Sequence, residues 1–207
     1  MINLALSIAA ALVAFFVFKL SGLPLLPSLL PAAVGLVATY ILLARRTVKQ
    51  LEAVMAQVQK ELQSRKPKRT ITVLKTAFPL GKWQFLVEGQ LHNQIGTLLY
   101  IQKKFEEAEP HLYKSFVKIW PARAMLAAQH YRRKEFDKMA EVFETAIKAN
   151  KNEGLLYAVY AWCEDKRGER RKAIDILQRG LKENPSDEKL KNLLLRTQND
   201  KRMKLET

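Results

Sequence analysis

The chain has 207 residues, enough for one ordinary domain or for a smaller domain with an appendage. Its formal net charge of +15 is unevenly distributed, because residues 1–44 contain no Asp, Glu or Arg and only one Lys. The single cysteine, Cys163, excludes an intrachain disulfide and agrees with a reducing compartment.

Two apolar runs, residues 2–18 and 25–44, predict a transmembrane hairpin of two helices in residues 1–44. A helix as long as the first run spans roughly 26 Å, close to the hydrocarbon thickness of a bilayer. Pro27 and Pro31 lie near the start of the second run, where a helix tolerates proline. A cleaved signal peptide is disfavoured because no basic residue precedes the first run. A buried soluble hairpin is the remaining alternative, disfavoured because two such runs carry a single charge.

The flanking charges predict the orientation of this hairpin. Arg45, Arg46 and Lys49 directly follow the second run, whereas the connecting loop has only Lys19 at its edge. The positive-inside rule then places both termini in the cytoplasm. We expect an integral membrane protein with two spans, with the bacterial inner membrane favoured.

Residues 45–69 are predicted to form an amphipathic helix followed by a basic linker. Apolar residues recur at spacings of 3, 4, 3 and 4, at Val48, Leu51, Met55, Val58 and Leu62. This stripe either pairs two copies of the chain through residues 48–62 or rests on the neighbouring domain. Pro67 and four basic residues in 64–70 indicate a linker near lipid headgroups. Residues 70–83 receive no assignment, since Ile71 to Val73 alternate like a strand without a partner.

Three segments share one pattern: residues 103–115, 134–146 and 168–180. In the first two an aromatic residue is followed by apolar or small residues three, seven and ten positions later, and the third keeps all but the aromatic. Apolar helical stretches precede each segment, in residues 90–102, 122–133 and 154–167. The pattern predicts helix–turn–helix units whose apolar faces are buried only by stacking on their neighbours.

These units resemble the tetratricopeptide repeat (TPR) family over residues 89–187. The resemblance rests on the residues Ile95, Gly96, Leu99, Phe105, Ala108, Leu112, Leu126, Ala127, Phe136, Phe143, Ala146, Ala161, Gly168, Ala173, Leu177 and Pro185. The chain departs from the family pattern in its first interval of 31 residues, in Met139, and in Trp120-Pro121 at the usual terminal proline. Pro110 is expected within the first turn of its helix. The predicted fold class is all-α, with the hairpin followed by a TPR-like solenoid in residues 70–207. Leu190, Leu193 and Leu194 mark a capping helix before a frayed tail.

No catalytic, cofactor or metal site is predicted. The three histidines have no HExxH or Cys/His cluster around them, the glycines form no phosphate-binding motif, and Cys163 has no base partner in the sequence. The sequence therefore argues against an enzyme.

The resemblance implies a partner groove lined by the first helices of the units. Its residues are Asn93, Thr97, Ala124, Ala128, Tyr131, Ala158 and Trp162. Some TPR domains hold acidic C-terminal peptides there with paired Lys and Asn, but here mostly Ala occupies those sites. Small residues beside Tyr131 and Trp162 favour an apolar or amphipathic segment of a partner. The alternative is that Trp162 belongs to the core.

The turns between paired helices are basic. Stacking is expected to align them into a ridge of Lys103, Lys104, Arg132, Arg133, Lys134, Lys166, Arg167, Arg170 and Arg171. The ridge is predicted to lie against anionic lipid headgroups, and its alternative is a set of solvated loops. A nucleic-acid interface is disfavoured, because aromatic residues for base stacking are not interleaved with these charges.

The expected function is that of a membrane-anchored scaffold or adaptor for other proteins. Two alternatives stay open: an accessory subunit that contacts a larger membrane complex through the hairpin, and a membrane-tethered nucleic-acid binder that uses the ridge. TPR folds serve many roles, so the sequence leaves the partner and the process unassigned.

Overall fold

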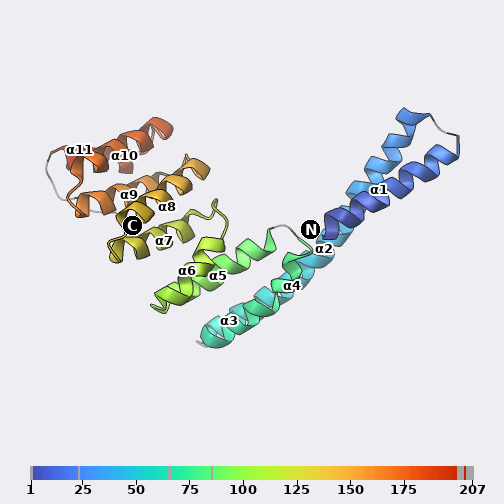
Figure 1. Cartoon of the computed structure of the whole chain (residues 1–207), viewed down its shortest axis with the longest axis horizontal. Coiled ribbons are helices and arrows are strands. Elements are labelled where there is room, and N and C mark those ends of the chain that lie inside the picture. The colour runs from blue at the N-terminus through green and yellow to red at the C-terminus, as the bar shows by residue number, and fades with distance from the viewer. Residues whose placement is uncertain (1, 23, 65–66, 85, 200–202, 204–207) are drawn as a thin grey trace. The chain divides into compact units, whose positions relative to one another are not determined.

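The computed structural model describes residues 2–22, 24–64, 67–84, 86–199 and 203, and its regular elements are all helices (Figure 1). This confirms the predicted all-α class. The chain forms two compact units, Met1–Ile95 and Gly96–Thr207. Helix α5 (Val87–Ile101) crosses the boundary between them.

The first unit contains the predicted hairpin. Helix α1 (Ile2–Leu20) packs along α2 (Leu25–Gln63), and both are long and apolar enough to cross a membrane. The second apolar run and the linker stripe form one continuous helix. Arg45 and Arg46 do not interrupt it, because Arg is a good helix former. Pro31 lies a full turn after Pro27, so it is inside α2 rather than in the first turn.

Residues 67–81 form two short helices, which corrects the strand-like alternation noted in the sequence. Helix α3 (Pro67–Thr76) packs against α2, and the short α4 (Phe78–Gly81) follows. The buried positions Thr70, Leu74 and Ala77 follow a period of three to four residues, which outweighs alternation over three residues. Of the predicted basic linker, residues 65–66 lie outside the described part of the chain.

The start of α1 is bonded to the segment that follows α4. The amide of Ile2 donates to the carbonyl of Lys82 at 2.9 Å, and the amide of Asn3 donates to that of Trp83 at 3.3 Å. The Asn3 side chain donates to Thr47 Oγ1 at 3.1 Å and to Gln84 Oε1 at 3.2 Å. These bonds satisfy N–H groups that have no partner inside a helix, and they tie α1, α2 and residues 82–84 together.

The second unit is a stack of paired helices, as predicted. Helix α6 (Phe105–Lys114) follows α5, α7 (Trp120–Arg132) pairs with α8 (Phe136–Ala149), and α9 (Gly154–Lys166) pairs with α10 (Arg170–Glu183). Helix α11 (Glu188–Gln198) covers α9 and α10, which fits the predicted cap. Apart from Asn199 and Met203, the predicted frayed tail lies outside the described residues.

The three turns between paired helices have the same geometry. Lys103, Lys134 and Gly168 have φ of 62°, 60° and 93°, and each following residue donates its amide to a carbonyl five positions back at 2.9 Å. A left-handed conformation is unfavourable for lysine, so the first two turns are strained where the third is relaxed. The repeat seen in the sequence is therefore also a repeat of backbone conformation.

The core of the second unit lies between α7, α8, α9, α10 and α11. Met139 is fully buried in place of a small residue. Pro110 lies in the middle of α6 and not in its first turn, which corrects the expectation for this residue. It is exposed, so the carbonyl that loses its helical partner is close to solvent.

Candidate partner-binding groove and basic ridge

The groove is the set of seven residues predicted above. Asn93 belongs to the first unit and the other six belong to the second. Ala158 is buried, whereas Ala124, Ala128, Tyr131 and Trp162 are half-buried. The groove residues of α7, and Trp162 of α9, therefore keep part of their surface open to solvent.

Tyr131 and Trp162 are brought together. Their ring centroids are 6.3 Å apart at an interplanar angle of 47°, and the Lys166 ammonium lies 5.6 Å from the Trp162 ring. Both rings pack against the edge of the core. Burial raises the pKa of the Tyr131 hydroxyl, with a smaller contribution from the neighbouring Cys163. This pair is half core and half surface, a position in which an aromatic residue can bind a partner.

Much of the basic ridge is neutralised by acids. Lys104 contacts Glu107 at 2.7 Å, Arg133 contacts Glu109 at 2.6 Å, and Arg167 contacts the fully buried Glu164 at 2.9 Å. Arg170 contacts Asp165 at 3.6 Å and also donates two hydrogen bonds to the Thr197 carbonyl. Within the described part of the chain, ion pairs are absent from the other ridge residues, Lys103, Arg132, Lys134, Lys166 and Arg171. The ridge thus carries fewer uncompensated charges than the sequence suggested.

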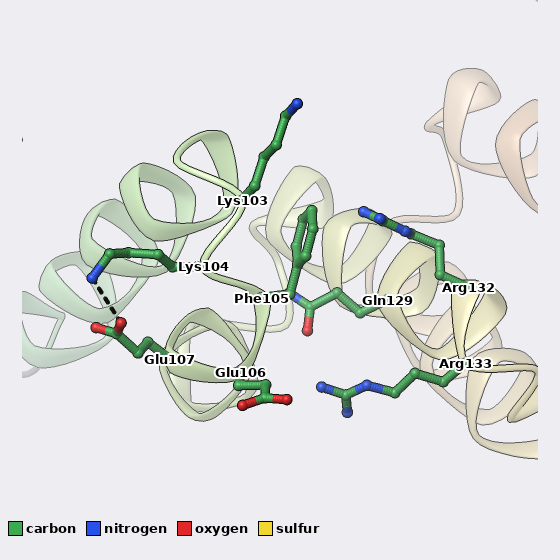
Figure 2. A pocket seen from close by; sticks show the side chains of 8 residues that line it. All are labelled: Lys103, Lys104, Phe105, Glu106, Glu107, Gln129, Arg132 and Arg133. Carbon is green, nitrogen blue, oxygen red and sulfur yellow. Dashed lines mark hydrogen bonds and ion pairs between the residues drawn. The ribbon is translucent and has the colours of Figure 1, made fainter.

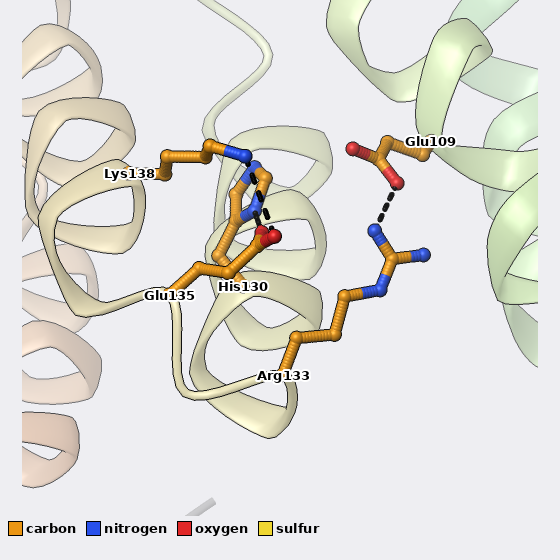
Figure 3. Close-up of polar contacts among 5 residues, drawn as sticks. All are labelled: Glu109, His130, Arg133, Glu135 and Lys138. Carbon is orange, nitrogen blue, oxygen red and sulfur yellow. Dashed lines mark hydrogen bonds and ion pairs between the residues drawn. The ribbon is translucent and has the colours of Figure 1, made fainter.

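A polar cluster links the first two repeats (Figure 3). Arg133 reaches from the end of α7 to Glu109 of α6, and Glu135 at the start of α8 contacts His130 at 2.6 Å and Lys138 at 3.3 Å. The hydrogen bond with His130 is the main cause of the lowered pKa of the Glu135 carboxyl. The contact between Arg133 and Glu109 therefore makes one ridge residue a structural joint between repeats, whereas the contacts of Glu135 lie within the second repeat.

A pocket of about 470 Å³ lies where the turn before α6 meets the end of α7 (Figure 2). We call it the Phe105 pocket, and its lining residues are Lys103, Lys104, Phe105, Glu106, Glu107, Gln129, Arg132 and Arg133. The Arg132 guanidinium carbon lies 4.1 Å from the centroid of the Phe105 ring. The sequence predicted four of these cations as ridge residues but did not predict a pocket.

Gln129 is the member of this pocket that sequence reasoning missed. Intervals of 31 and 34 residues make it equivalent to Leu98 and Cys163, which are both apolar. Gln129 is 2% exposed, and neither its amide nitrogen nor its amide oxygen has a hydrogen-bond partner among the described residues. A polar residue at an apolar position of the repeat was the available signal.

Among the described residues, no group of three or more His, Cys, Asp or Glu could hold a metal ion. His92 packs against Phe78 with centroids 5.0 Å apart, and His130 contacts Glu135. Cys163 is buried in the core. These residues have structural environments in the two units.

Comparison with known proteins supports the fold. The chain is similar to the solved structure titled "MamA RS-1 ArsTM double mutant", a TPR-containing protein, at 16% identity and a TM-score of 0.53. The match covers 72% of this chain and 84% of that one. The helical stack is therefore TPR-like. No family model and no curated relative matches the chain.

Proposed function

We propose that this protein is a membrane-anchored scaffold whose TPR-like repeats bind partner proteins at the cytoplasmic face of a membrane, without chemistry of its own. The observation that carries the proposal is the low burial of two apolar helices. Only 17% of the most apolar window of α1 is buried, and none of that of α2. Core helices of soluble proteins are mostly buried, so these surfaces need lipid or another protein around them.

The contacts of α1 argue against a cleaved signal peptide. Residues 2 and 3 bond to residues 82–84, and Asn3 also bonds to Thr47 of α2. Removal of α1 would leave these polar partners without their hydrogen bonds. This supports a retained hairpin. The positive charges of Arg45, Arg46 and Lys49 favour cytoplasmic termini, and we favour the bacterial inner membrane.

The groove supplies the proposed binding surface. Tyr131 and Trp162 are paired and half-buried, and α7 also carries the small, half-buried side chains of Ala124 and Ala128. Aromatic residues in such positions are common anchors of protein interfaces. We assign to this surface an apolar helical or extended segment of a partner.

The experiment is recovery of partners from native membranes in mild detergent. Partners of the full chain are identified by mass spectrometry, and their affinity is then measured against Trp162→Ala. Truncation of an anchoring aromatic residue costs about 2 kcal/mol, which weakens binding roughly thirtyfold. Trp83→Ala is the matched control, because Trp83 is 40% exposed and lies in the first unit.

Thermal melting of the Trp162→Ala variant distinguishes a role of Trp162 in the groove from a role in the core. A core tryptophan cut to alanine costs about 3 to 5 kcal/mol of stability, so a melting temperature lowered by many degrees would assign Trp162 to the core. Unchanged affinity for every partner would refute the groove.

An exchange of the hairpin distinguishes the scaffold from the alternative, an accessory subunit of a larger membrane complex. Residues 4–44 are replaced by an unrelated two-span hairpin, which keeps Asn3 and Thr47. A scaffold retains its partners after this exchange, whereas an accessory subunit held by its spans loses them.

The proposal also includes a contact between the basic ridge and lipid headgroups. Five ridge cations without ion pairs could each contribute about 1 kcal/mol toward an anionic bilayer surface. The acids that neutralise part of the ridge disfavour a nucleic-acid binder.

The stripe on α2 is partly covered, since Val58 is buried while Val48 and Leu62 are exposed. This favours packing within one chain over pairing of two copies through residues 48–62.

A further inference from the structure

The Phe105 pocket combines satisfied and unsatisfied charges. Lys104 and Arg133 are compensated by Glu107 and Glu109. Lys103 and Arg132 make no ion pair within the described part of the chain. Figure 2 shows the side chains of Lys103 and Arg132 on either side of Phe105, with Gln129 beneath the ring. Two cations without an ion pair among the described residues therefore line the same pocket.

Gln129 gives this space a hydrogen-bonding base. Its amide is buried, lines the pocket, and points from α7 toward the start of α6 (Figure 2). A buried polar group without a partner is destabilising. Leu98 and Cys163 avoid that cost at the equivalent positions. Gln129 offers an NH₂ group as donor and a carbonyl oxygen as acceptor, whichever way its amide is oriented.

Arg132 is held in place without losing its donors. Its guanidinium stacks on the Phe105 ring, 4.1 Å from guanidinium carbon to ring centroid. Stacking uses the face of the guanidinium, so the N–H groups at its edge remain directed outward. Such an edge matches a carboxylate, which accepts two parallel N–H bonds.

We propose that the Phe105 pocket binds an acidic peptide segment of a partner protein. A backbone amide of the segment pairs with Gln129 Oε1 and Nε2, and an acidic side chain pairs with Arg132 and Lys103. A phosphate monoester dianion fits less well, because it has no donor for the amide oxygen of Gln129 and places about twice the negative charge of a carboxylate beside Glu106 and Glu107. This inference rests on the proposed scaffold function and names the chemistry of the partner.

The pocket is a different site from the groove. Its residues come from the turn before α6 and from positions 129, 132 and 133 of α7, and none of them belongs to the groove. One partner segment could engage either site alone. The two sites can therefore be tested separately.

The test is an NMR titration of the ¹⁵N-labelled full chain in detergent micelles. The probe is the peptide acetyl-Ala-Glu-Ala-Glu-Ala-amide, and its matched control has Gln in place of both Glu. The side-chain resonances are assigned by their loss in Gln129→Leu and Arg132→Gln. We expect the Glu peptide to shift both resonances in a saturable way, and the Gln peptide to bind about tenfold more weakly.

Three variants test whether the Glu peptide binds in the Phe105 pocket. Arg132→Gln and Gln129→Leu should each weaken binding of the Glu peptide about tenfold, whereas Arg171→Gln should leave it unchanged. Arg171 is an exposed ridge cation with no ion pair to any described residue, so it controls for net charge. Absence of any shift, equal weakening by Arg171→Gln, or full binding by Gln129→Leu would each overturn the proposal.

Inorganic phosphate is titrated as a second probe. If phosphate moves the same resonances at equal or lower concentration, the pocket is an anion site for phosphate and the peptide assignment is wrong. None of these measurements requires a cellular partner or an intact groove. Their failure would leave the recovery experiment with Trp162→Ala as an independent test of the scaffold function.

Discussion

At the scale of single residues, the reactivity of Cys163 is determined by its burial in the repeat core. It lies in the core of the second unit and is 2% exposed. Burial, assisted by the charge of Glu164, raises the pKa of its thiol from 9.0 to about 12. Only the thiolate is nucleophilic, so this cysteine should be inert in the folded chain.

We expect iodoacetamide to alkylate Cys163 slowly in the native chain and rapidly after denaturation. Because the folded state favours the neutral thiol, its contribution to stability is complete below pH ~9 and is lost as the pH rises toward ~12. The free energy of unfolding, measured across this range, should therefore fall less steeply in Cys163→Ala. Equal alkylation rates in both states would contradict the assigned burial.

The environments of charged side chains were the feature that the sequence predicted least well. Arg133 and Arg167 were assigned to an open ridge, yet they contact Glu109 and the buried Glu164. Whether a basic side chain finds an acid depends on the rotation of each helix about its axis, and composition does not determine that rotation. Gln129 was missed for the same reason, since a glutamine in a helix is usually exposed.

At the scale of elements, periodicity predicted the helices of the repeats and missed the joints of the first unit. The six predicted repeat helices correspond to α5 to α10, because each has apolar residues that recur at helical spacing. The continuity of α2 was not predicted, since a change from apolar to charged residues marks the edge of a bilayer without ending a helix. Helix α3 was missed because its short segment contains β-branched residues with weak helical preference.

Gly180 on α10 tests the close approach of paired helices. A Cβ atom at this position would lie 2.8 Å from Tyr157 Cγ and 3.2 Å from Leu190 Cδ1. Alanine gains about 1 kcal/mol of helix propensity, but overpacking costs about 1 to 3 kcal/mol. We therefore expect Gly180→Ala to lower the free energy of unfolding in a urea titration. Gln178→Ala on the exposed face of α10 should change it by less than about 0.5 kcal/mol. A more stable Gly180→Ala variant would show that α9 and α10 can separate at no cost.

At the scale of the molecule, the proposed membrane anchor predicts where along the first unit the bilayer would end. Helix α2 has 39 residues and is therefore about 58 Å long, nearly twice the hydrocarbon thickness of about 30 Å. Its apolar first half pairs with α1, and its charged second half carries α3. Residues 82–84 then return to the start of α1, where Asn3 and Thr47 meet. Trp83 is 40% exposed at this level, as expected of an aromatic residue at a membrane interface.

This arrangement predicts which residues a reagent outside the cell can reach. Ser21 lies in the loop between α1 and α2 and Lys68 lies at the start of α3, and both are exposed. In intact cells a membrane-impermeant maleimide should label Ser21→Cys, and it should label Lys68→Cys only after lysis. The native Cys163 serves as an internal blank because it is buried. Alkaline carbonate should leave the protein in the membrane fraction, since two spans are held by apolar burial and not by charge. Labelling of Lys68→Cys in intact cells would reverse the orientation. Release by carbonate would instead show that α1 and α2 bury their apolar faces against protein, which is the arrangement that an accessory subunit requires.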